Sequence, residues 1–185
     1  MKKSILFILI VPFSLLAQHL EVATPTQISW QGKAAYSSYS PEGSLQLLSG
    51  RLSLKDGVID TLNIVIDMRS LQQENQQLRD HLRDADFFDV ERFPVATFIL
   101  TEPLKQATGE VELVGNLTIK GNTKEERIKA NISESSQGLS LQFEHQMDRT
   151  EYGVTFNSPS FFENLKDQAI DDHFSLKGTI QFTSR

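Results

Sequence analysis

The chain has 185 residues, no cysteine and a formal net charge of −6 at pH 7. An acidic chain without a basic run is a poor binder of nucleic acid or of an anionic membrane. Without disulfides, stability must come from the core and from strand pairing, and the length predicts one domain with a substantial core.

The first seventeen residues have the pattern of a secretory signal peptide. Lys2 and Lys3 precede the apolar run 5–16, and Ala17 offers a small residue for cleavage. The run is short for a transmembrane helix, and an uncleaved anchor is the alternative. The pattern predicts a signal peptide over residues 1–17 and a mature domain over residues 18–185. We expect a bacterial periplasmic protein without an integral membrane span, with secretion to the medium as the alternative.

Alternating apolar and polar residues predict strands through most of the mature chain. An irregular lead-in over residues 19–26 precedes a short first strand around Ile28 and Trp30. A second strand over residues 45–54 changes phase beside Gly50, which is typical of a β-bulge, and an Asp-Gly turn leads into a third. The alternating runs are 62–68, 95–104, 111–119, 128–132, 139–147 and 174–182.

The stretch 78–98 interrupts this pattern. Leu78 and Leu82 are four residues apart and therefore share one face of a helix. Phe87 and Phe88 follow where that helix should end, and a Phe-Pro dipeptide then marks the start of the next strand. We expect a short helix, inserted after the third strand, that caps one end of the sheet structure.

About eight strands with hairpin-length turns predict an all-β fold. An eight-stranded antiparallel barrel with an inserted capping helix is favoured, because several strands reach about ten residues, and a sandwich is the alternative. Such a barrel is just wide enough to be filled by side chains or to hold one slender ligand. Gly115 and Gly178 lie on the apolar parity of two strands, which favours a cavity over a filled core.

Residues that could act in catalysis or bind a metal are scattered along the sequence. The four histidines lie in four different predicted elements without a metal-ligand spacing, and there is no Gly-x-Ser-x-Gly motif. Asp171 and Asp172 are adjacent and would face opposite sides of a strand. His145 is in phase with inward residues, which is typical of a hydrogen-bonded core histidine, and Asp148-Arg149 is typical of a strand-end ion pair or turn device. The sequence predicts no catalytic residue, no metal and no cofactor.

Several segments together resemble the YceI-like polyisoprenoid-binding proteins, and they follow the family's order over nearly all of the mature chain. The matches are S-x-Q-G-K from Ser29, D-M-x-S-L from Asp67, H-L-x-x-A-D-F-F-D-V-x-x-F-P-x-A-x-F from His81, G-N-L-T-I-K-G from Gly115, D-R-T from Asp148 and S-F-F-x-x-L-x-D-x-x-I-x-D from Ser160.

The resemblance implies a lipocalin-like barrel whose interior is a long hydrophobic pore. It implies an exported protein without enzymatic activity, which holds a polyisoprenoid or another long-chain amphiphile, such as an isoprenoid quinone or its precursor, for storage or transfer. Many relatives have a histidine in the loop after the first strand. Residues 35–43 contain none, so Tyr36 or Tyr39 is expected to take its place near the ligand head.

Aromatic placement and strand parity then suggest the residues of the pore and its mouth. These are Trp30, Tyr36, Phe98, Phe143, Phe156, Phe161, Phe162 and Phe174. Two alternatives stay open: a structural or stress-response module with a filled barrel, and an enzyme acting on such a lipid through Asp167, Asp172 or His145. Exposed edges or a wide mouth would permit a homodimer, although no residue requires one.

Overall fold

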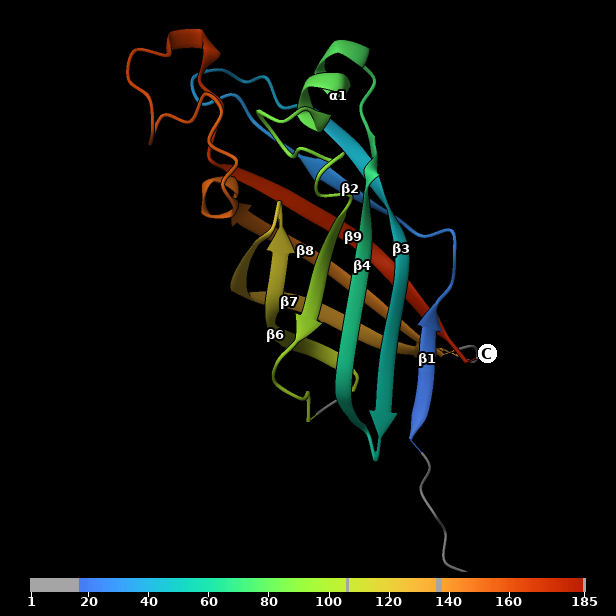
Figure 1. Ribbon diagram of the computed structural model, residues 1–185. Coiled ribbons are helices and arrows are strands. Elements are labelled where there is room, and N and C mark those ends of the chain that lie inside the picture. The colour runs from blue at the N-terminus through green and yellow to red at the C-terminus, as the bar shows by residue number, and fades with distance from the viewer. Residues whose placement is uncertain (1–16, 106, 136–137, 185) are drawn as a thin grey trace, which may run out of the picture.

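The computed structural model describes residues 17–105, 107–135 and 138–184 (Figure 1). The expected signal peptide, apart from Ala17, lies outside the described residues. The strands are β1 Gln18–Val22, β2 Gln27–Gln31, β3 Glu42–Lys55, β4 Val58–Gln72, β5 Val95–Leu100, β6 Gly109–Ile119, β7 Asn122–Ser135, β8 Gly138–Asp148 and β9 His173–Thr183. The helices are α1 Gln76–Arg83 and the 3-10 turns η1 Arg149–Tyr152 and η2 Lys166–Gln168.

The strands form one closed antiparallel barrel. Neighbours follow the order β3-β2-β9-β8-β7-β6-β5-β4, and pairing of β4 with β3 closes the ring. β1 and β2 both lie between β3 and β9, so they act as two pieces of one interrupted strand. The eight-stranded antiparallel barrel expected from the sequence is therefore confirmed, and the sandwich is excluded.

The lead-in differs from the prediction. Residues 18–22 form β1, whose Leu20 lies opposite Leu52 of β3 and whose Val22 lies opposite Phe182 of β9. Both side chains are buried. Two inward residues are too few for alternation to reveal a strand, and the pairing with distant strands decides the conformation instead.

The phase change beside Gly50 is confirmed. The register between β3 and β4 shifts between Leu47 and Ser49, which leaves Leu48 opposite no residue and exposed. Before the shift Leu45 and Leu47 face the core, and after it Gly50 and Leu52 do so. One extra residue at this bulge thus keeps a fourteen-residue strand facing the same interior.

The expected helix is α1, and it covers one end of the barrel (Figure 1). The Asn75 side chain accepts a hydrogen bond of 3.1 Å from the Leu78 N–H and caps the first turn. Leu82 is buried, and Phe87 and Val90 in the following turn join the same core. The segments 32–41 and 153–172 lie at the same end of the barrel as α1, which we call the mouth.

Candidate functional site

A cavity of about 150 Å³ lies at the mouth, under α1. Strands β2, β3, β4, β5, β6 and β9 line its sides, and Leu78 and Leu82 of α1 cover it together with Phe87 and Phe88. The rim carries Tyr39 and several polar residues, while the walls are almost wholly apolar. This is the arrangement of a site for a ligand with an apolar body.

A second cavity of about 50 Å³ adjoins the first, deeper in the barrel. Ile66, Leu117 and Leu176 line both cavities and form the wall between them. His145 is the single polar residue lining the inner cavity, among fourteen apolar ones. A ligand that occupied both spaces would have to displace the shared wall.

Aromatic rings stack beside the mouth cavity. The His81 ring of α1 lies 4.6 Å from the Phe156 ring and 5.7 Å from the Phe87 ring, both in edge-on arrangements. Phe88 makes a similar contact with Phe174 of β9, at 6.3 Å. We call α1 and the turn that follows it, residues 76–90, the cap. These ring contacts fix the cap to the barrel and to the segment after η1 by packing.

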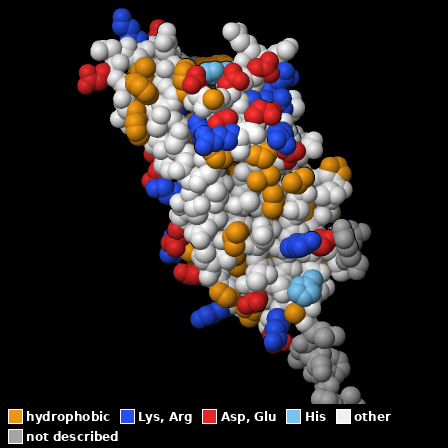
Figure 2. Space-filling model, viewed as in Figure 1, with side chains coloured by type: hydrophobic (Ala, Val, Ile, Leu, Met, Phe, Trp, Pro, Cys, Tyr) orange, Lys and Arg blue, Asp and Glu red, His pale blue; other side chains and the backbone are white. Residues whose placement is uncertain are grey.

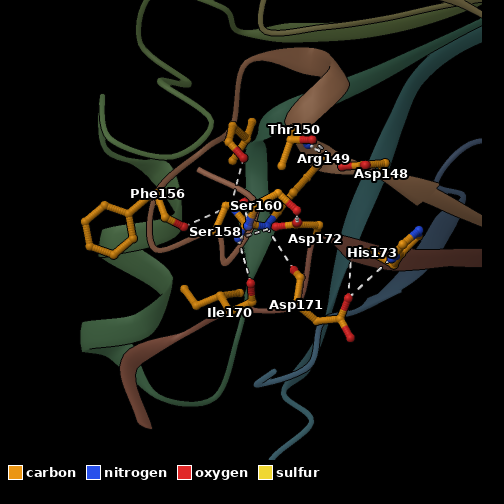
Figure 3. Close-up of polar contacts among 11 residues, drawn as sticks. Asp148, Arg149, Thr150, Phe156, Ser158, Ser160, Ile170, Asp171, Asp172 and His173 are labelled. Carbon is orange, nitrogen blue, oxygen red and sulfur yellow. Dashed lines mark hydrogen bonds and ion pairs between the residues drawn. The ribbon is translucent and has the colours of Figure 1, made fainter. Parts of the chain in front are cut away.

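One buried arginine organises the other side of the mouth (Figure 3). Arg149 is 2% exposed, and its guanidinium donates to the carbonyl oxygens of Asp171, Val154, Phe156 and Ile170 at 2.7–3.0 Å. A fifth, longer contact of 3.5 Å reaches Oδ1 of Asp172.

The charge of this guanidinium is balanced within the network. Burial lowers the pKa of Arg149 from its usual value, while the carboxylates of Asp172, Asp148 and Asp171 act in the opposite direction. Asp148 Oδ1 also accepts from the Thr150 N–H at 2.8 Å, so it caps η1. The interpretation of Asp148-Arg149 as a turn device is confirmed for Asp148, but the ion-pair partner of Arg149 is the distant Asp172.

A second polar cluster fills a gap in the barrel wall. β7 and β8 pair only from Ala130 and Phe143 onward to the hairpin turn between them. In the unpaired part, Glu126 accepts from the Tyr152 hydroxyl at 2.5 Å and lies 2.9 Å from Nε2 of His145. Burial raises the pKa of Tyr152, and the hydrogen bond to Glu126 acts in the same direction. The hydrogen-bonded core role expected of His145 is confirmed.

The structure separates the residues that an enzyme hypothesis would need. Asp167 is exposed in η2, while Asp172 is buried, accepts from the Ser160 hydroxyl at 2.5 Å and lies beside Arg149. His145 lies in the barrel wall and pairs with Glu126. Among the described residues, no cluster of three or more metal-ligating side chains occurs, and no helix is long and apolar enough to cross a membrane.

The residues suggested from the sequence for the pore and mouth fall into three groups. Trp30 and Phe174 line the mouth cavity, and Phe98 and Phe143 line the inner cavity. Phe156 packs on His81 beside the mouth. The structure does not bring Tyr36, Phe161 and Phe162 into either cavity: they are 67%, 58% and 50% exposed. A binding role for each of these residues remains a prediction.

Several lining residues were not singled out from the sequence. Met68, Leu71, Ala96 and Ile119 line the mouth cavity. Inward parity was the available signal for Met68, Ala96 and Ile119, whereas Leu71 is out of phase with Met68 on β4. Tyr39, the alternative to Tyr36, does line this cavity.

Residues 21–182 match the model of the YceI-like domain. The chain belongs to the YceI-like family. A UPF0312 protein of Vibrio vulnificus is 30% identical over 146 residues, which cover 74% of this chain and 77% of the relative. The protein YceI of Salmonella arizonae is 35% identical over 78 residues, covering 42% of this chain and 40% of that protein.

Solved structures of low identity share the YceI-like barrel. A polyisoprenoid binding domain from Saccharophagus degradans has a TM-score of 0.67 at 12% identity, covering 89% of this chain and 98% of that domain. BcnA of Burkholderia cenocepacia has a TM-score of 0.62 at 15% identity, covering 84% and 94% of the two chains. At these identities the likeness shows the fold.

Proposed function

We propose that this YceI-like protein binds a polyisoprenoid or another long-chain amphiphile, such as an isoprenoid quinone or its precursor, for storage or transfer. The observation that carries the proposal is the pair of adjoining apolar cavities under one cap. The ligand tail would lie along the barrel and the head at the mouth. The family and the polyisoprenoid binding domain of similar fold support this assignment.

Burial of an apolar tail supplies the affinity. Each buried CH₂ contributes about 0.8 kcal/mol, so even partial enclosure of a long tail gives tight binding. The same site supports a non-catalytic role, because its apolar lining suits binding and offers a polar reaction little assistance.

The small size of the cavities favours one alternative function, in which side chains fill the barrel and the protein acts as a structural module. The cavities measure about 150 and 50 Å³, whereas drug-sized ligands occupy pockets of roughly 300–1,000 Å³. A carrier must therefore widen on loading, through the shared wall of Ile66, Leu117 and Leu176 and through the cap.

Native mass spectrometry of the purified mature protein, followed by organic extraction, separates the two functions and also gives the oligomeric state. We expect a stoichiometric adduct that is released as a long-chain isoprenoid or fatty amphiphile. Protein of bare mass that takes up neither added quinone nor added prenol would contradict the carrier function and favour the filled barrel.

Neighbouring residues on β5 provide a matched pair of variants. Ala96 is buried in the mouth cavity, whereas Val95 beside it points outward. In Ala96→Leu the added side chain occupies the ligand space, so the adduct should be lost, while Val95→Leu should retain it. Equal adduct in both variants would place the ligand elsewhere.

We also propose that the protein acts in the periplasm after removal of residues 1–17. The basic and apolar pattern of these residues supports export. Cell fractionation and sequencing of the mature N-terminus test this, with Gln18 as the expected first residue. A chain that retains residues 1–17, or that stays in the cytoplasm, would overturn the proposal.

A further inference from the structure

Trp30 brings a hydrogen-bond donor to an otherwise apolar wall. The residue is 8% exposed and lines the mouth cavity. Its indole N–H is buried and has no hydrogen-bond partner among the described residues. The other such group is Nε of Arg83, whose side chain still donates to the Arg69 carbonyl through Nη2. Within the part of the chain that the structure describes, Trp30 is therefore the buried side chain whose whole donor capacity is unused.

An unused buried N–H is costly. Leaving such a donor without an acceptor costs about 1–3 kcal/mol, and buried polar groups in native proteins nearly always have a partner. A phenylalanine at this position would provide a similar apolar surface without that cost. We therefore expect the indole N–H to bind an acceptor that the folded chain itself does not provide.

The neighbouring strands leave room for the flat indole ring of Trp30. Trp30 on β2 lies opposite Gly43 of β3 and Leu176 of β9. A Cβ on Gly43 would lie 2.0 Å from the Gln72 carbonyl oxygen and 2.6 Å from two carbons of the indole. The glycine therefore lets both the end of β4 and the indole ring approach the β3 backbone. Gly32 and Lys33, which follow Trp30 in the chain, line the same cavity at its rim. The indole thus lies near the level of the mouth.

We propose that the Trp30 indole N–H anchors the ligand head by donating a hydrogen bond to an uncharged acceptor, a carbonyl oxygen. This inference rests on the proposed function, because it assumes that the tail occupies the barrel. Carbonyl groups of a quinone ring, an amide or an ester share this chemistry. For the head to reach this buried N–H, the mouth must widen on loading, as the proposed function also requires.

The buried cation at the mouth is already committed to acceptors within the chain. Arg149 is the buried cation of the mouth cavity, and its Nε and both terminal nitrogens already donate to four carbonyls and to Asp172. On the rim, the exposed Lys33 and the partly exposed Asp171 carry opposite charges that offset each other, so the rim supplies no net charge for an anionic head. An indole N–H carries no formal charge, so it recognises a carbonyl without requiring a counter-charge.

Competition between two lipids of similar length tests the proposal. Mature protein is loaded with an equimolar mixture of menaquinone-4 and squalene, and the bound lipids are extracted and quantified for the wild type, Trp30→Phe and Ser49→Ala. We expect the wild type to enrich the quinone, and Trp30→Phe to reduce the quinone-to-squalene ratio about tenfold, as one lost hydrogen bond implies. Ser49→Ala, which removes a hydroxyl from the exposed face of β3 outside both cavities, should leave the ratio unchanged.

An unchanged ratio in Trp30→Phe would overturn the head-group assignment while leaving the carrier function intact. Failure of the wild type to bind either lipid would instead overturn the carrier function. A measurement on the wild type covers the case in which Trp30→Phe does not fold. The chain has a single tryptophan, so the indole N–H gives one NMR resonance, which should shift downfield with menaquinone-4 and not with squalene. Identical spectra with both lipids would contradict the proposal.

Discussion

The cap and the segment 153–172 both cover the mouth, but they are held in different ways. Figure 2 shows hydrophobic side chains on the surface at this end of the molecule. The cap packs through leucines and rings, and its long-range polar ties are few: Lys120 Nζ donates to the Ala85 and Phe87 carbonyls, and Arg83 donates to the Arg69 carbonyl. The other segment is joined to the barrel by the buried Arg149, which binds carbonyls at both ends of the segment.

This difference indicates which cover yields to a ligand. Apolar packing is non-directional and can be rebuilt around a tail, whereas a buried guanidinium with five acceptors has one good geometry. We therefore expect the cap to move on loading and the Arg149 segment to keep its shape.

Removal of the buried cation should have the largest effect. In Arg149→Met, four carbonyls lose their donor and Asp172 is left without its cation. We expect the free energy of unfolding to fall by about 3–5 kcal/mol, as when one partner of a buried ion pair is removed. Urea denaturation followed by circular dichroism measures this loss.

An exposed arginine provides the control for that variant. Arg127 pairs with Glu112 and Glu125 on the barrel surface, and all three side chains are about half exposed. Arg127→Met should change the stability by less than about 1 kcal/mol, since exposed ion pairs contribute little. Similar losses in Arg149→Met and Arg127→Met would show that the Arg149 network does not hold the mouth.

Tyr152→Phe should destabilise the protein in a way that depends on pH. The hydroxyl is buried and donates to Glu126, so its removal should cost about 2 kcal/mol near neutral pH. Burial raises the pKa of Tyr152 above its usual value. The folded state therefore keeps the proton to a higher pH than the unfolded state does, and this contribution is complete below about pH 10, the ordinary tyrosine pKa, and falls above it.

The difference in stability between the wild type and Tyr152→Phe should thus shrink as the pH rises past that value. Chemical denaturation at several pH values measures it, with the exposed Tyr36→Phe as the control that should show no such trend. A difference that grows in alkali would refute the assigned environment of Tyr152.

Lys120→Met should loosen the cap with a smaller global effect. Lys120 Nζ donates to the Phe87 carbonyl at 2.6 Å and to the Ala85 carbonyl at 3.0 Å from a partly exposed position. Because water can replace the ammonium there, we expect a loss of about 1 kcal/mol. Hydrogen exchange of the Phe88 and Val90 amides, which donate to the Leu82 and Arg83 carbonyls, should accelerate more than exchange in the barrel.

Lys124→Met, on the exposed face of β7, is the matched control and should leave those amides unchanged. Uniformly faster amide exchange throughout the barrel in Lys120→Met would instead mean that the cap and the barrel unfold as one unit. The cap would then not be the cover that yields to a ligand by itself.

Local periodicity was enough to predict these parts of the fold: two-residue alternation predicted the barrel and the phase change beside Gly50, and the four-residue spacing of Leu78 and Leu82 predicted the inserted helix. These features depend on local periodicity and on short turns, which the sequence displays directly. β1 was missed because its two inward residues give no period, and its pairing partners on β3 and β9 are far away in the chain.

The site was harder to predict, because it depends on distant residues and on side-chain volume. The sequence places Asp148 next to Arg149, but the buried partner is Asp172, which the antiparallel pairing of β8 with β9 brings near. Parity assigned Phe98 and Phe143 to the interior, yet it has no meaning in the loops that carry Tyr36, Phe161 and Phe162. Whether an apolar interior is filled or hollow follows from packing, which periodicity does not record.

The last prediction compares exposed phenylalanines with a buried one, and the double surface variant has the smallest expected effect on stability. Phe161 and Phe162, on the segment held by Arg149, are exposed, whereas Phe87 in the cap is buried. Phe161→Ser combined with Phe162→Ser should change the stability by less than about 0.5 kcal/mol, as is usual for surface substitutions. Phe87→Ser should cost about 3 kcal/mol or more, because it leaves a cavity and buries a hydroxyl.

Thermal unfolding and the bound-lipid content of both variants check this pair. If the exposed rings take no part in binding inside the barrel, the double variant should retain its lipid at wild-type stoichiometry. A double variant that keeps its stability but loses its lipid would show that Phe161 and Phe162 fold over the loaded mouth. The segment held by Arg149, and not the cap, would then be the cover that moves.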